Sequence, residues 1–155
     1  MKGNKKVLKE LQSLLNGELG ARDQYFAHSR KFKDWGMHKL HERLNHEMGE
    51  ETEHADMLIE RMLFLETEPD MTKPMKPKVG KDVEEMLRND LDVEYMVVDE
   101  LKRAISICEQ EQDYDTRQML LKLLDDTEMD HAYWLEQQLG LIERIGLQNY
   151  IQSQM

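Results

Sequence analysis

Residues 40–65 read LHERLNHEMGEETEHADMLIERMLFL, and their apolar side chains recur at the three- and four-residue spacing of one helical face. Ionisable residues interrupt this face at mid-length. In order along it stand Leu40, Leu44, Glu47, Glu51, His54, Leu58 and Leu65. Because a buried carboxylate without a partner is energetically costly, the stretch predicts a long helix whose core-facing side binds a cation.

The same periodicity predicts four long helices at about 4 to 34, 37 to 65, 82 to 111 and 114 to 143, with a short fifth helix at about 147 to 154. Between the second and third lies the segment from Glu66 to Lys81, which contains all three prolines of the chain. Fully extended, this segment could reach about 50 Å, enough to run the whole length of a bundle whose helices span about 40 Å. We therefore expect an all-α fold in one domain, residues 1–155: a four-helix bundle with one long crossover between helices 2 and 3.

Composition and charge limit the partners and the cellular location that this chain can have. A formal charge of −11 disfavours nucleic acid and anionic membrane surfaces as partners and favours cations. The first ten residues, MKGNKKVLKE, are too polar for a signal peptide, and no apolar run approaches the roughly 20 residues of a membrane span. Cys108 is the single cysteine, so no internal disulfide can form. These observations predict a cytoplasmic protein without a membrane anchor.

Each long helix carries a carboxylate at mid-length on its apolar face, and the second and fourth carry the motif Glu-x-x-His. Positions i and i+3 share one helical face, so each motif can present oxygen and nitrogen to one point. Oxygen with imidazole suits iron or manganese, and four glutamates balance the charge of two Fe²⁺ ions. The pattern predicts a di-iron centre in the core, with six metal ligands: Glu18, Glu51, His54, Glu94, Glu128 and His131.

Four stretches of the chain resemble a bacterioferritin, and the resemblance covers essentially the whole length. They are GELGARDQYFAHSR (17–30), LNHEMGEETEHADMLIERMLFLE (44–66), DVEEMLRNDLDVEY (82–95) and DTEMDHAYWLEQQLGLIERIGLQNYIQSQ (126–154). The resemblance implies a ferritin-like fold and a cage of twenty-four subunits. It also implies a ferroxidase that oxidises Fe(II) with dioxygen or hydrogen peroxide and stores the ferric mineral. Glu18 and His54 would bind one iron and Glu94 and His131 the other, with Glu51 and Glu128 bridging the pair.

Other residues gain roles through the same resemblance. Tyr25, seven residues after Glu18 on one face, would hydrogen-bond the site or supply an electron; a core tyrosine paired with a carboxylate is the alternative. His46 would bind iron at the inner surface or pass electrons across the cage wall, with Glu50 where relatives have aspartate. A ferredoxin-type protein would supply electrons for iron release.

Three histidines, His28, His38 and His41, follow no such pattern, and we expect them at the surface or at an interface. Glu47 and Asp90, each one turn before an expected ligand, are candidates to orient a histidine or a carboxylate of the site.

This chain differs from bacterioferritins at the haem-binding position. Bacterioferritins hold haem through a methionine, and the corresponding residue here is Thr52. A hydroxyl is a poor substitute for a thioether on haem iron. We therefore expect no haem b on this subunit unless a methionine-bearing partner subunit in a mixed cage supplies it. Two alternatives stay open: a structural or storage cage subunit working with such a haem-binding partner, and a di-iron oxidase or peroxidase acting on another substrate.

Overall fold

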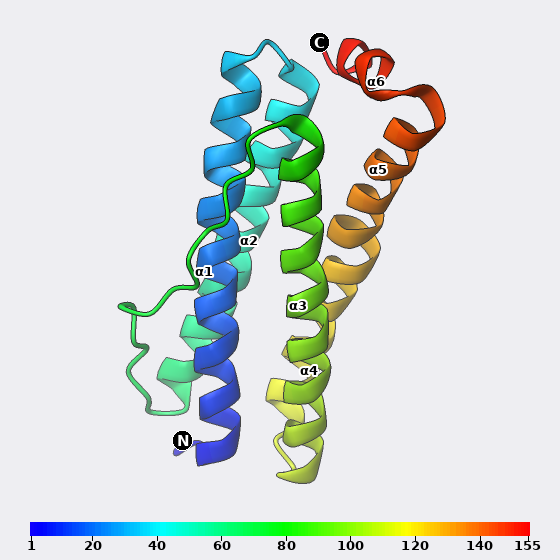
Figure 1. The fold of residues 1–155 in the computed structure, drawn as a ribbon. Coiled ribbons are helices and arrows are strands. Elements are labelled where there is room, and N and C mark those ends of the chain that lie inside the picture. Colours follow the sequence, from blue (N-terminus) through cyan, green and yellow to red (C-terminus); the bar gives the residue numbers. More distant parts are fainter.

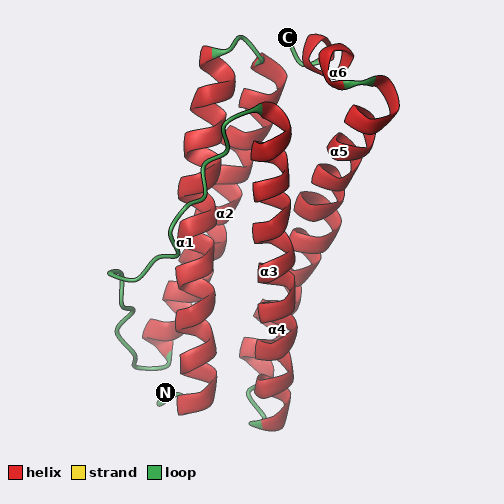
Figure 2. Cartoon of the chain, viewed as in Figure 1, coloured by secondary structure: helices red, strands yellow, loops and turns green.

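A computed structural model describes residues 1–155 and contains helices and loops but no strands (Figure 2). The elements are α1 (Lys5–Asp34), α2 (His38–Phe64), α3 (Val83–Gln110), α4 (Tyr114–Asp125), the π-helical turn η1 (Asp126–Ala132), α5 (Tyr133–Ile145) and α6 (Leu147–Ser153). The all-α prediction is confirmed, and the expected helix bounds are met within a few residues. The expected fourth helix runs through α4, η1 and α5, interrupted by the π-helical turn.

The long helices form a bundle in which α1 lies beside α2, and α3 lies beside α4 and α5 (Figure 1). The short α6 turns off the end of α5 near the chain's C-terminus. Side chains accept hydrogen bonds from the first free backbone amides of three helices, at Asn4, Asp82 and Asp113. None of the helices combines the length and the hydropathy that crossing a membrane requires.

The crossover from α2 to α3 runs along the surface of α1, as Figure 1 shows. Four backbone amides of the crossover donate hydrogen bonds to α1: Asp70 N to Gln12 Oε1 (2.8 Å), Met75 N to Asn16 O (2.9 Å), Lys78 N to Gln24 Oε1 (2.9 Å) and Gly80 N to His28 Nε2 (3.0 Å). His28 is fully buried in this contact, so its expected surface position is wrong. The reason is that its second ring nitrogen faces Asp90, 2.9 Å away, and both ring nitrogens are therefore satisfied inside the protein.

Gly20 allows the crossover to approach α1 closely. A Cβ atom on Gly20 would lie 2.4 Å from the carbonyl oxygen of Met75, which belongs to the crossover backbone. We expect Gly20→Ala to lower the free energy of unfolding by about 1–3 kcal/mol, because the backbone must move to make room. Thermal unfolding followed by circular dichroism measures this effect. Gly49→Ala is the matched control, since nothing lies within 4 Å of its Cβ position; that variant should be as stable as the parent or more so.

The fourth helical segment buries a different face from the one that the sequence suggested. Leu120 and Leu123 are fully buried, whereas Leu121 is 39% exposed, so the expected seam through Leu121 and Leu124 is displaced by one residue. The π-helical turn then takes up one extra residue, as such turns do. From His131, near the end of the turn, the expected face returns to the core, and Leu135 and Ile142 on α5 are buried as well.

Candidate metal centre

Five of the six predicted ligands meet in the middle of the bundle. Glu18 comes from α1, Glu51 and His54 from α2, Glu94 from α3 and His131 from η1. None is more than 3% exposed. Because each lies on the apolar face of its helix, packing the four faces together brings these polar groups to one place.

The five residues form two triads that share Glu51. In the first, His54 Nδ1 lies 3.4 Å from Glu18 Oε2 and 3.7 Å from Glu51 Oε2. In the second, His131 Nδ1 lies 2.9 Å from Glu51 Oε1 and 3.4 Å from Glu94 Oε1. Within each triad, one ligand atom of every residue lies within 4.8 Å of the others. The two oxygens of Glu51 therefore face different triads, as a carboxylate bridging two cations would.

The residues that are present fit a pair of metal ions. Buried polar atoms in proteins are almost always hydrogen-bonded, yet both oxygens of Glu18 and the Nδ1 atoms of His54 and His131 have no hydrogen-bond partner. These four atoms belong to the two triads, whereas the two other such atoms, Glu47 Oε2 and Asp90 Oδ2, do not. Carboxylate oxygen with imidazole nitrogen is a donor set for iron or manganese. Two divalent cations would satisfy these atoms together.

Without metal, the cluster retains protons. Burial lowers the pKa of His54, but the carboxylates of Glu18 and Glu51 outweigh burial and raise that pKa to about 11. Burial and the neighbouring Glu51 raise the pKa of Glu18 well above the ordinary value. Burial likewise raises the pKa of Glu94. At neutral pH, protons thus provide the positive charge that the cluster needs.

Metal binding should therefore release protons. Because the Nδ1 atoms must be deprotonated to bind a cation, we expect about two protons to leave per pair of metal ions at pH 7. The pKa of His54 lies above 7, so apparent metal affinity should rise with pH between 6 and 8. Calorimetric titration with Zn²⁺ in buffers of different ionisation enthalpy counts the protons. Zinc binding without proton release would contradict the protonated state of the metal-free cluster.

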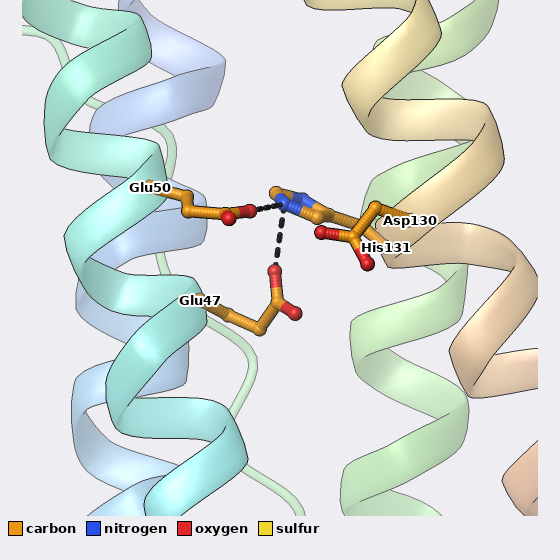
Figure 3. A group of neighbouring side chains, drawn as sticks. All are labelled: Glu47, Glu50, Asp130 and His131. Carbon is orange, nitrogen blue, oxygen red and sulfur yellow. Dashed lines mark hydrogen bonds and ion pairs between the residues drawn. The ribbon is translucent and has the colours of Figure 1, made fainter.

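A second group of carboxylates lies on the outer side of His131 (Figure 3). The Nε2 atom of His131 lies 2.7 Å from Glu47 Oε2 and 2.5 Å from Glu50 Oε2. Arg43 neutralises part of this group, through Glu47 at 2.6 Å and Asp130 at 3.0 Å. Glu47 is thus placed to orient His131, as the sequence suggested.

The other expected orienting residue, Asp90, faces His28 and Gln24 in the crossover contact. No hydrogen bond joins Asp90 to either triad, so the structure places it in the attachment of the crossover. His46 lies 62% exposed, with Nε2 at 2.8 Å from Glu50 Oε1. Glu50 therefore contacts both the exposed His46 and the buried His131.

Glu128 is not brought to the cluster. Its side chain is 41% exposed and its Oε1 atom lies 3.5 Å from Lys102 Nζ. The physical reason is the displaced register of α4, which turns Thr127 into the core in its place. Glu128 was expected to bridge the metals, but in this structure its side chain lies outside the cluster.

Tyr25 is buried and its hydroxyl donates a hydrogen bond to Glu94 Oε1. Burial and the nearby Glu94 raise the pKa of this hydroxyl well above the usual value. The residue thus touches a candidate ligand and stays protonated at neutral pH. Thr52 lies exposed on α2, where its hydroxyl donates to the backbone oxygen of Met48 at 2.9 Å.

The sequence did not predict that Asp126 contacts His54. Its Oδ2 atom lies 3.1 Å from His54 Nε2, on the side of the ring away from the triads. Asp126 lies beside α2 because the π-helical turn begins there. No local signal in residues 114–143 marks such a turn, so the contact could not be predicted.

Two buried carboxylate–histidine triads that share one glutamate, in a helical bundle, are candidate metal-binding groups typical of the class of proteins with dinuclear centres. Comparison with known proteins makes the class specific. Residues 8–145 match the family model described as a ferritin-like domain. A protein named bacterial ferritin from Synechocystis sp. is 63% identical over 155 residues, which cover 100% of this chain and 99% of the relative.

Two further relatives agree with this match. A bacterial ferritin from Pseudomonas aeruginosa is 56% identical, with 100% of both chains covered. A bacterioferritin from Brucella melitensis biotype 1 is 39% identical over 150 residues, which are 97% of this chain and 92% of the relative. The chain therefore belongs to the ferritin family, and the resemblance to bacterioferritins is confirmed.

Proposed function

We propose that this protein stores iron and is a ferroxidase that oxidises Fe(II) at the paired triads. The single observation that carries the proposal is the buried set of four unpartnered ligand atoms on Glu18, His54 and His131, arranged around the shared Glu51. Membership of the ferritin family supports iron as the metal. Glu18 and His54 bind one ferrous ion, Glu94 and His131 bind the other, and Glu51 lies between them.

Two ferrous ions held this closely can each give up one electron to the same oxidant. With dioxygen, the two electrons and two protons produce one hydrogen peroxide, and with hydrogen peroxide they produce two waters. The protein fixes the positions of both ions before the oxidant arrives, which is the part of the barrier that orientation removes. After oxidation the two ions would carry two more positive charges against the same carboxylates, and hydroxide from water, formed with release of protons, would restore the charge balance.

Tyr25 and the outer residues support this reaction. The Tyr25 hydroxyl holds Glu94 in place through its hydrogen bond and is near enough to that ligand to give an electron. His46 and Glu50 form the inner-surface iron site, because Glu50 links the exposed imidazole to His131.

We place the protein in the cytoplasm, in a cage of twenty-four copies or in a cage shared with a haem-binding subunit. The formal charge of twenty-four copies, 24 × −11, would concentrate Fe²⁺ near the cage. Thr52 supplies no haem ligand, and a ferredoxin-type donor would reduce the stored iron.

The test is anaerobic loading of the purified assembly with Fe(II), followed by mixing with oxygen while ferric absorbance is recorded. We expect two Fe(II) per subunit to be oxidised in a fast phase. In a His54→Ala, His131→Ala variant, that phase should be lost. Equal rates in the parent and this variant would refute the assignment of the site.

A matched control keeps the experiment specific. His38→Ala removes an exposed histidine far from the triads, and its fast phase should equal that of the parent. Light scattering on the same samples measures assembly, since a cage of twenty-four subunits would have a mass of 24 × 18.5 kDa. A monomer would contradict storage in a cage.

A further inference from the structure

We infer that Asp126 is a positioning residue for His54: it holds the Nε2–H of the ring so that Nδ1 presents its lone pair to the metal. This inference rests on the proposed function, because it concerns the binding of a divalent cation at the first triad. Asp126 begins the π-helical turn η1 and is not a member of either triad.

The geometry of His54 carries the argument. The ring is 3% exposed, its Nε2 atom lies 3.1 Å from Asp126 Oδ2, and its Nδ1 atom has no hydrogen-bond partner. The two ring nitrogens point in opposite directions, so Asp126 cannot bind the same cation as Nδ1. A neutral imidazole carries its proton on one nitrogen only, and that choice follows the hydrogen bond available. With a carboxylate accepting from Nε2, the lone pair stays on Nδ1, toward Glu18 and Glu51.

Nothing else near His54 can perform this task. The contacts of its Nε2 atom are limited to Asp126, whereas His131 Nε2 has both Glu47 and Glu50. The carboxylate of Asp126 is itself held by Lys122, whose Nζ lies 3.5 Å from Oδ2. The two histidines are therefore oriented by different outer carboxylates, and each can be perturbed alone.

The experiment uses cobalt(II) as the probe, because its visible absorption reports binding to imidazole. The full-length assembly is titrated anaerobically, and affinities for the two metals are fitted separately. Loss of an outer partner of a ligating histidine typically weakens metal binding by about 10–100-fold. We expect Asp126→Ala to weaken the binding of one of the two cobalt ions by this factor and to leave the affinity for the other unchanged. Asp126→Asn, whose amide oxygen can still accept from Nε2–H, should lose less.

Two controls separate the possible failures. Lys122→Met removes the exposed partner of Asp126 but leaves the contact with His54, and it should bind both ions within about twofold of the parent. His54→Ala should lose the same cobalt ion that Asp126→Ala weakens. If His54→Ala binds both ions normally, the proposed metal site itself is refuted.

If His54→Ala loses one ion while Asp126→Ala binds both normally, only the role of Asp126 is refuted. A merely structural role would appear as equal weakening of both ions together with a lower thermal midpoint, and that result would also overturn the inference. Unchanged binding of the second ion and an unchanged thermal midpoint, with the first ion weakened, would support it.

Discussion

Replacing Glu51 with glutamine is expected to weaken the binding of both metal ions, each by more than about 100-fold, which is the upper end of the loss caused by removing an outer partner. The physical reason is that Oε1 and Oε2 of this carboxylate face different triads, at 2.9 Å from His131 and 3.7 Å from His54. An amide offers one oxygen in place of two and carries no charge. Cobalt titration, followed by the rate of Fe(II) oxidation, measures the effect.

Glu128→Gln is the matched comparison, because the resemblance to bacterioferritins implies the same bridging role for Glu51 and Glu128. In the structure Glu128 contacts Lys102 outside the cluster, so we expect its variant to bind both metals within about twofold of the parent. A loss as large as that of Glu51→Gln would instead show that Glu128 turns inward when metal binds. Loss of one ion alone in Glu51→Gln would contradict the shared position of Glu51.

Replacing Glu18 with leucine is expected to stabilise the metal-free protein by about 1–3 kcal/mol at pH 8, the cost of burying a polar group that has no hydrogen bond. Neither carboxylate oxygen of Glu18 has a hydrogen-bond partner, and the side chain is fully buried. The residue is thus retained at a cost in stability, as binding sites often are. Denaturant unfolding with a chelator present measures the gain.

The pH dependence of this effect has a definite sign. Burial and Glu51 raise the pKa of Glu18 in the folded protein above the ordinary value of 4.5. The folded state then binds more protons than the unfolded state, so the contribution of Glu18 to stability falls as pH rises above 4.5. The advantage of Glu18→Leu should accordingly be larger at pH 8 than at pH 5. A variant less stable than the parent at pH 8 would contradict this account.

Glu143→Leu supplies the control, because Glu143 is exposed on α5 and its replacement should change stability by no more than about 0.5 kcal/mol. Added Zn²⁺ should reverse the order of stabilities. The parent gains binding free energy in its folded state, whereas Glu18→Leu loses one of the two sites.

The helices and most of the site could be predicted from local pattern. The spacing Leu44, Glu47, Glu51, His54, Leu58 places ionisable groups on one apolar face whatever the rest of the protein does, because three- and four-residue spacing defines a helical face. The proline-containing segment between the second and third helices could only be a long connection. The same kind of spacing on the other long helices, together with that connection, predicted the bundle, its crossover and the five candidate ligands that meet in the structure.

Tertiary packing decided the rest. Residues 120–124 read LLKLL, so two apolar registers one residue apart are locally equivalent. Packing against α3 buries Leu120 and Leu123, and the π-helical turn restores the register at His131. That choice turns Glu128 toward Lys102 and brings Asp126 to His54, and contact with the crossover likewise buries His28. Each outcome depends on which neighbouring surface a side chain meets, and helical periodicity carries no information about it.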